Sequence, residues 1–268
     1  MALQTSGAIS LLNIATEFGG SAPHSLSEYY GASSGIPTSG VISIGNFYGA
    51  TAYTVPTQPT GTTTWLAYNS GTVTSPTLDF GPAKSNRYIV AIVTNEENKT
   101  VSVSSCTIGG VVATQLANKA QWSGSYGACS SIWIALVPSG TSGTVVSNKS
   151  LGRIGVKILT LEGGGGVATG STTSATNYST SATMTMPLSN VGNTVTVSNV
   201  CHTSAGGGGS CSYSLSRSAY LSGSNKNYGF AMSVSPQSAT SDTSTVGISG
   251  ATFKGRANAA AGCTVAIG

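Results

Sequence analysis

Acidic side chains are the first residues to consider for chemistry, because glycoside cleavage uses a pair of carboxyl groups. The candidates in this chain are Asp79, Glu96, Glu97, Glu162 and Asp242. Two of them are adjacent in sequence, which is typical of a solvated turn, and the others have no regular spacing. The pattern therefore does not predict an acid–base pair, although a glycosidase remains an open alternative.

Nucleophilic and phosphate-binding motifs are equally weak. His24 precedes a short apolar pattern, which indicates a structural role, and His202 has no acidic neighbour in sequence. The segment 31–35, GASSG, has nucleophile-elbow spacing, but Pro37 interrupts the helix that such an elbow needs. The run Gly163–Gly166 lacks the Gly-Lys-Ser/Thr ending of a phosphate loop. We therefore expect no catalytic residue and no cofactor.

The five cysteines do not form a metal-binding pattern, because no CxxC pair occurs among them. Two of them, Cys201 and Cys211, flank the run Gly206–Gly209, so a hairpin could bring them within disulfide distance. The alternative is that all are buried thiols, as expected for a chain whose start shows no secretory signal. We expect no metal site. The cysteines are Cys106, Cys129, Cys201, Cys211 and Cys263.

Aromatic residues provide a better signal for binding. Several of them lie in or near stretches rich in Ser, Gly and Asn, where an aromatic face could stack on a sugar ring. The alternative is that these rings cover the ends of a β-sheet core. The candidate ligand-binding residues are Trp122, Tyr126, Tyr213, Tyr220 and Tyr228.

Composition further narrows the classes of protein to which this chain could belong. Only 7% of the 268 residues are charged, against roughly 25% in ordinary globular proteins. The formal net charge is +4, but the basic residues are scattered singly, so we expect no nucleic-acid partner. The densest apolar run, Ile132–Val137, is the length of a strand, which argues against membrane insertion.

Residues 1–51 contain three copies of one short pattern. In each copy a Ser stands where a helix N-cap would be, and a capping side chain follows three residues later. An apolar or aromatic pair with the spacing of a hydrophobic staple surrounds each cap. Each copy therefore predicts an extended entry followed by one or two helical turns. The caps and their partners are Ser10 with Asn13, Ser25 with Glu28, and Ser43 with Asn46.

Three short turns bury too little surface to offset their ordering entropy, so this segment should not form its own core. Its large apolar groups are nevertheless too many to leave in water. We therefore predict a docking arm that packs on another protein, with the chain's own second domain as the alternative surface. The predicted docking residues are Ile9, Leu11, Ile14, Phe18, Leu26, Tyr29, Tyr30, Ile44, Phe47 and Tyr48.

The remainder of the chain predicts strands. Residues 52–64 are uncharged and rich in Pro and Thr, which indicates an extended linker. Tyr88–Thr94 is a continuous apolar run that suits a strand buried on both faces, and later segments alternate apolar with small or polar residues. We predict a mainly β protein: an N-terminal arm of short helical turns, then one antiparallel β-sandwich over residues 65–268 with jelly-roll-like topology.

The opening segment also resembles a known family. The strings TSGAISL at 5–11, EFGG at 17–20, SLSEYY at 25–30, IPTSGVIS at 36–43 and FYG at 47–49 are similar to N-terminal segments of virion proteins from tailed bacteriophages, especially marine phages. In that family the segment precedes variable β-rich domains. Separately, residues 86–90, 103–110 and 132–138 are similar to β-sandwich domains of phage and bacterial surface proteins.

The resemblance implies a non-enzymatic virion structural protein of the tail-fibre or spike type, assembled in the host cytoplasm. Residues 1–51 would dock on other virion proteins of the tail, neck or capsid, and the sandwich would face outward and could bind a host-surface glycan. A homo-oligomer, preferably a trimer, is expected. The alternatives are a capsid decoration or head-fibre protein, a tailspike-like glycan depolymerase and a bacterial secreted adhesin.

Overall fold

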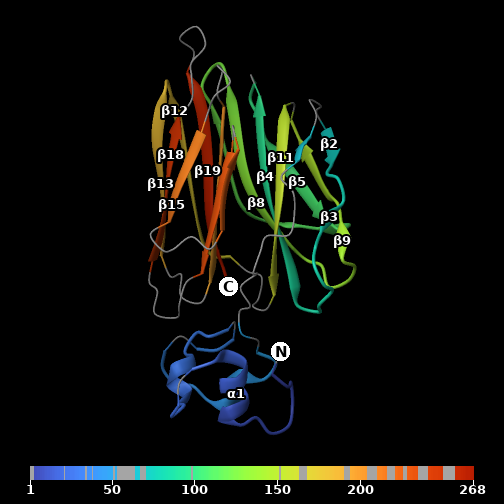
Figure 1. The fold of residues 1–268 in the computed structure, drawn as a ribbon, viewed down its shortest axis with the longest axis vertical. Coiled ribbons are helices and arrows are strands. Elements are labelled where there is room, and N and C mark those ends of the chain that lie inside the picture. Colours follow the sequence, from blue (N-terminus) through green and yellow to red (C-terminus); the bar gives the residue numbers. More distant parts are fainter. Residues whose placement is uncertain are drawn as a thin grey trace.

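The computed structural model shows a mainly β protein with three short helical elements near its N-terminus (Figure 1). The structure describes residues 3–20, 22–33, 35–37, 39–50, 52, 64–66, 71–97, 99–150, 152–162, 168–189, 194–203, 210–215, 221–225, 228–234, 241–249 and 257–268. Of the side chains in residues 64–66, 210–215, 221–225 and 228–234, only those of Ser212 and Met232 are described.

The helical elements follow the three sequence copies. They are the α-helix α1 (Leu11–Phe18) and the 3-10 helices η1 (Leu26–Tyr29) and η2 (Ile44–Phe47). The predicted cap at Ser10 is confirmed, because its Oγ accepts a hydrogen bond from Asn13 N at 3.1 Å, and its N donates to Asn13 Oδ1 at 2.9 Å. At the third copy, Ser43 N donates to Asn46 Oδ1 at 2.8 Å.

The predicted capping box at the second copy is wrong. Ser25 makes no side-chain cap, and its hydroxyl instead lies 2.8 Å from Ser27 Oγ. Glu28 turns away from the cap position toward His24, with Oε2 3.4 Å from Nδ1. A carboxylate prefers a partner that can be cationic to a neutral backbone N–H, and sequence spacing alone does not show that such a partner is in reach.

Residues 3–52, here called the N-terminal unit, close on themselves. Leu3 N donates to Ala50 O at 2.8 Å and Gly49 N donates to Gln4 O at 3.1 Å, so the two ends of the unit lie side by side. At the junction of the second and third copies, Gly31 N donates to the carbonyl oxygen of residue 37 at 2.8 Å. The three copies therefore form a ring and not an extended arm.

The N-terminal unit has its own hydrophobic core. Three aromatic rings form a triangle at its centre: Phe18 lies 6.0 Å from Tyr29 and 5.9 Å from Phe47, and Tyr29 lies 6.0 Å from Phe47. Phe47 is fully buried, and so is Ile14, which belongs to the same core. The expectation that these fifty residues could not close a core was wrong. The three turns are not independent, because each copy contributes a side chain to one shared centre.

In the residues that the structure describes, the first half of the β region has eleven strands. Sheet I has the order β2-β10-β5-β6, sheet II has the order β1-β11-β4-β8-β7, and β3 pairs with β9. All pairings are antiparallel. The strands are β1 (Thr64–Leu66), β2 (Gly71–Thr74), β3 (Leu78–Asp79), β4 (Arg87–Glu97), β5 (Val103–Ile108), β6 (Val111–Val112), β7 (Thr114–Trp122), β8 (Gly127–Leu136), β9 (Ser142–Gly143), β10 (Val145–Lys149) and β11 (Arg153–Glu162).

Eight further strands form the second half. Sheet III has the order β12-β19-β14-β17-β16, and sheet IV has the order β13-β18-β15, again with antiparallel pairing throughout. The strands are β12 (Ala168–Tyr178), β13 (Ser181–Ser189), β14 (Val195–His202), β15 (Ser210–Leu215), β16 (Leu221–Asn225), β17 (Tyr228–Val234), β18 (Ser241–Ser249) and β19 (Asn258–Ile267).

The four sheets stack in the order I, II, III, IV. One buried cluster, with Ile89, Val103 and Trp133, joins sheets I and II. A second joins the opposite face of sheet II to sheet III, through residues such as Ile132 and Val265, and a third joins sheets III and IV. The prediction of a β-sandwich is confirmed, but the structure has two sandwiches packed through their inner sheets, and not one.

The two sandwiches have the same topology. Eight strands of the first sandwich each have a counterpart in the second that pairs with the same neighbours. The counterparts of β1, β2, β4, β5, β7, β8, β10 and β11 are, in this order, β12 to β19. In the first sandwich the orders β1-β11-β4-β8 and β2-β10-β5-β6 place the first strand beside the last and the second strand beside the last but one, which is the pairing of a jelly roll. The prediction of a jelly-roll-like topology is therefore confirmed, although apolar periodicity predicts strands and not their pairing partners.

Candidate partner-binding surfaces

The acidic residues have structural partners. Glu96 is buried and lies 3.8 Å from Arg153 Nη1, while Glu162 pairs with Lys84. At the end of β3 and near the start of β18 a carboxylate accepts a backbone N–H: Asp79 Oδ1 from Gly81 N at 2.8 Å, and Asp242 Oδ1 from Thr243 N at 2.9 Å. Each carboxylate therefore helps to hold a strand end or a turn.

His202 is also part of a structural network. It is buried at the end of β14, and its Nδ1 lies 2.9 Å from the hydroxyl of Tyr178. That hydroxyl donates to Thr203 O at 2.8 Å. The network ties the end of β12 to the end of β14. In the elbow-like segment, residues 31–33 form a turn and bends, and Ser33 is buried. The run Gly163–Gly166 lies outside the described residues.

The cysteines of the described chain are buried thiols. Cys201 packs among Ala128, Ala259 and Ala261, and its thiol donates to Asn95 O at 3.5 Å, so it is not bridged to Cys211. Burial raises the pKa of Cys106 to about 11 and those of Cys129 and Cys263 to about 12. In the described residues, no three His, Cys, Asp or Glu side chains gather into a metal-binding group.

The candidate ligand-binding aromatics are only partly brought together. The registers place the ends of β4 and β7 together, because Glu97 and Trp122 are both opposite Gly127, and the Cys201 thiol at the end of β14 donates to Asn95 O near the end of β4. This end of the sheet stack is here called the far end. In Figure 1 the N-terminal unit and the C-terminus lie at the other end of the stack.

Trp122 is 39% exposed at the far end, and Tyr126 is half-buried in the turn that follows. This turn is closed by Ser123, whose N donates to Tyr126 O at 2.9 Å and whose Oγ accepts from Tyr126 N at 3.0 Å. The backbone of Tyr228 lies at the same end, whereas Tyr213 lies within β15 on the outer sheet IV. Tyr220 lies outside the described residues.

The predicted docking residues divide into two groups. Ile9, Ile14, Tyr29 and Phe47 are buried in the unit's own core and are therefore not a docking surface. This corrects the prediction, because a side chain that is buried in the unit's own core cannot also contact a partner. Leu11, Phe18, Leu26 and Tyr30 are half-buried, and Ile44 and Tyr48 are 39% and 41% exposed.

Sequence reasoning missed two exposed apolar residues of this unit. Leu12 is 70% exposed on α1, and Val41 is 90% exposed just before η2. Both stand outside the staple and cap positions, so the repeat pattern gave no reason to choose them. Within the described residues, none of the hydrophobic clusters joins the N-terminal unit to the sheets. The unit thus combines a separate core with exposed apolar side chains.

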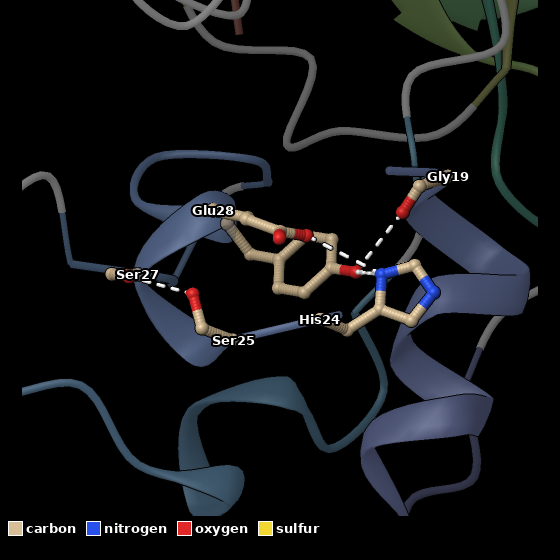
Figure 2. A network of polar contacts seen from close by, with 6 residues as sticks. Gly19, His24, Ser25, Ser27 and Glu28 are labelled. Carbon is tan, nitrogen blue, oxygen red and sulfur yellow. Dashed lines mark hydrogen bonds and ion pairs between the residues drawn. The ribbon is translucent and has the colours of Figure 1, made fainter. Parts of the chain in front are cut away.

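A polar network holds the second copy against the first (Figure 2). The hydroxyl of Tyr29 donates to Gly19 O at 3.0 Å and lies 3.3 Å from His24 Nδ1, which in turn lies 3.4 Å from Glu28 Oε2. A Cβ on Gly20 would come within 2.8 Å of the same carboxylate. The Glu28 side chain would have to move to accept that Cβ, and the φ of +117° also favours glycine at position 20. The pairing of Glu28 with His24 explains the different cap of this copy.

Arg87 is the most heavily bonded side chain that sequence reasoning missed, since a single basic residue carries no pattern that predicts its burial. It is fully buried at the start of β4, and all five of its N–H groups donate to backbone carbonyls. Nε donates to Val137 O at 2.9 Å, and the other acceptors, at 2.7 to 2.9 Å, are the carbonyls of residues 81, 82, 139 and 140. Burial lowers its pKa.

Comparison with known proteins adds no identification. No protein-family model matches this chain, and no curated protein matches it either. In the part of the chain that the structure describes, no helix has the length and apolar character needed to span a membrane.

Proposed function

We propose that this chain is a non-enzymatic structural protein of a tailed-phage virion, attached through its N-terminal unit and displaying the two sandwiches outward. The carrying observation is that residues 3–52 form a separate core and still expose Leu12 and Val41 by 70% and 90%. Large apolar groups that a small unit leaves in water are typical of a protein–protein contact. The resemblance of residues 5–49 to virion proteins supplies the class of partner.

The stack of sheets supports the outward role. Its two inner sheets are covered on both faces, which gives a stiff body in which the far end is separated from the N-terminal unit by the length of the strands. Trp122 and Tyr126 at that end offer aromatic surface to a host glycan. The acidic residues are engaged in turns and ion pairs, which favours binding over glycan cleavage.

The test is deletion of residues 1–51 in phage particles. We expect a soluble sandwich pair that no longer enters the particle, and a full-length chain carrying Val112→Ser, an exposed position in the sheets, as a control that enters normally. Undiminished incorporation of the shortened chain would reject the attachment role. Release of reducing sugar from host polysaccharide, lost on Glu162→Gln or Asp242→Asn, would instead support a depolymerase.

A capsid decoration protein is the second candidate. It requires only the exposed apolar residues Leu12 and Val41 of the N-terminal unit and no ligand at the far end. Glycan-array binding by the full chain separates the two candidates. Binding that Trp122→Ala abolishes supports a receptor-binding fibre or spike, whereas a chain that binds no glycan but raises the heat resistance of the particle supports decoration.

A further inference from the structure

The N-terminal unit is built with approximate threefold symmetry. The aligned residues Tyr30 and Tyr48 each donate a hydroxyl hydrogen bond to the next copy, to the aligned Gly40 and Gly7. The backbone bonds from Gly31 and Gly49 to residues 37 and 4 repeat in the same way. The aligned residues Ile14, Tyr29 and Phe47 are all buried in one shared cluster, which places the three copies around one centre.

This symmetry defines one set of matching surface positions. The residue directly after the cap Ser is Leu11, Leu26 or Ile44, so it is aliphatic in all three copies and half-buried or exposed in each. A threefold rotation places aligned residues on one side of the unit at equal distances from its axis. In contrast, the more exposed Leu12 aligns with Ser27 and Gly45 and has no apolar counterpart.

We infer that the N-terminal unit of a single chain binds on the threefold axis of a trimeric virion protein. Each of Leu11, Leu26 and Ile44 enters an apolar pocket on one partner subunit. Since no Lys or Arg precedes Lys84, the pockets are recognised by apolar contact and not by salt bridges to acidic groups. Three equivalent contacts made by one chain add avidity that a single contact lacks. This inference rests on the proposed attachment role.

The inference changes the expected stoichiometry. A chain with internal threefold symmetry matches a trimer without itself being trimeric, because repetition within the chain replaces repetition of chains. We therefore expect one copy of this chain for each threefold axis of its partner, where a trimeric fibre would supply three. The partner is a homotrimer with one apolar pocket on each subunit.

The experiment has two arms. Cryo-electron microscopy of unmodified particles, reconstructed without imposed symmetry, should show one sheet stack on each occupied threefold axis. In parallel, Leu11→Ser, Leu26→Ser and Ile44→Ser should each lower the number of copies per particle by a similar factor, roughly tenfold, as expected for losing one buried aliphatic side chain. Val112→Ser, at an exposed apolar position in the sheets, is the control and should leave the copy number unchanged.

The outcomes are distinct. Three stacks around each axis, or a loss confined to one of the three substitutions, overturns the inference. Thermal unfolding of each variant checks that its unit still folds, and the reconstruction decides the stoichiometry even where a variant does not. If the chain without residues 1–51 enters particles normally, the attachment role itself has failed. If that deletion abolishes entry while the three substitutions act unequally, only the threefold inference has failed.

Discussion

The N-terminal unit and the sheet stack both use internal repetition, but at different scales. Three copies of a short turn share one central aromatic triangle, so each copy contributes only a few buried side chains. Two sandwiches of identical topology share a whole face of sheet, and each also has a separate core of its own. A small repeat therefore depends on its neighbours to fold, whereas each large repeat has most of its core within itself. The predictions below test this contrast.

The largest effect should come from the aromatic triangle. Phe47→Ala removes a fully buried ring in contact with Phe18 and Tyr29, and such a change costs about 3–5 kcal/mol. For a unit of this size that loss is comparable to its whole stability, so the unit should unfold while the sheets stay folded. Two-dimensional NMR would show loss of the N-terminal signals alone. Val41→Ala, at a 90% exposed position, should leave the spectrum intact.

Removal of Arg87 should have the next largest effect, confined to the first sandwich. Arg87→Met leaves five carbonyl groups without their donors, and each buried polar group that loses its partner costs about 1–3 kcal/mol. Partial access of water to the loops reduces the sum, so we expect about 3 kcal/mol in chemical denaturation. Lys84→Met, which removes a largely exposed partner of Glu162, should cost less than about 1 kcal/mol. An equal loss in both variants would contradict this.

The interface between the sandwiches offers a smaller test. Asn199 Nδ2 of sheet III donates to Ser130 Oγ of sheet II at 2.8 Å, and that hydroxyl donates to Asn199 O at 3.1 Å. Ser130→Ala should destabilise the stack by about 1–3 kcal/mol in equilibrium unfolding, because the amide keeps no partner there. Adding Asn199→Leu removes the amide and should restore part of the loss. If the double variant is less stable than Ser130→Ala alone, the Ser130–Asn199 pair contributes to stability beyond satisfying its own polar groups.

The buried thiols should have the smallest effect at moderate pH. The raised pKa values of Cys106, Cys129 and Cys263 mean that the folded chain keeps these protons while the unfolded chain releases them above about pH 8.5. The contribution of these thiols to the free energy of unfolding is therefore fully present below that pH, and it falls as the pH rises toward 11. At pH 9 the loss should be below about 1 kcal/mol per thiol. Unfolding at pH 7 and pH 9, with a Cys-to-Ala triple variant as control, checks this slope.

Apolar pattern predicted the β region better than it predicted how the strands assemble. The run Tyr88–Thr94 correctly indicated a strand buried on both faces, and the four-layer stack explains why both faces are covered. The duplication of the sandwich was missed because the two halves match in topology, while aligned strands such as β11 and β19 differ in side-chain size. Strand pairing is a long-range property, and local periodicity does not contain it.

The N-terminal repeats show the opposite balance. Local spacing correctly predicted the caps at Ser10 and Ser43, because a cap is made within four residues. It failed for Ser25, where Glu28 and His24 pair instead. The core was missed because ring closure depends on Leu3 and Ala50, whose small or isolated side chains carried no pattern. Exposure of Leu12 and Val41 likewise depends on how the ring is arranged.

The hydrogen bond that joins Leu3 to Ala50 has a consequence for evolution and engineering. The polypeptide enters and leaves the ring at neighbouring points. The ring can therefore be fused to the N-terminus of another domain without a change in either fold. Joining the old ends with a short bridge and opening the chain in the bends at 31–33 should yield a circular permutant with the same aromatic centre.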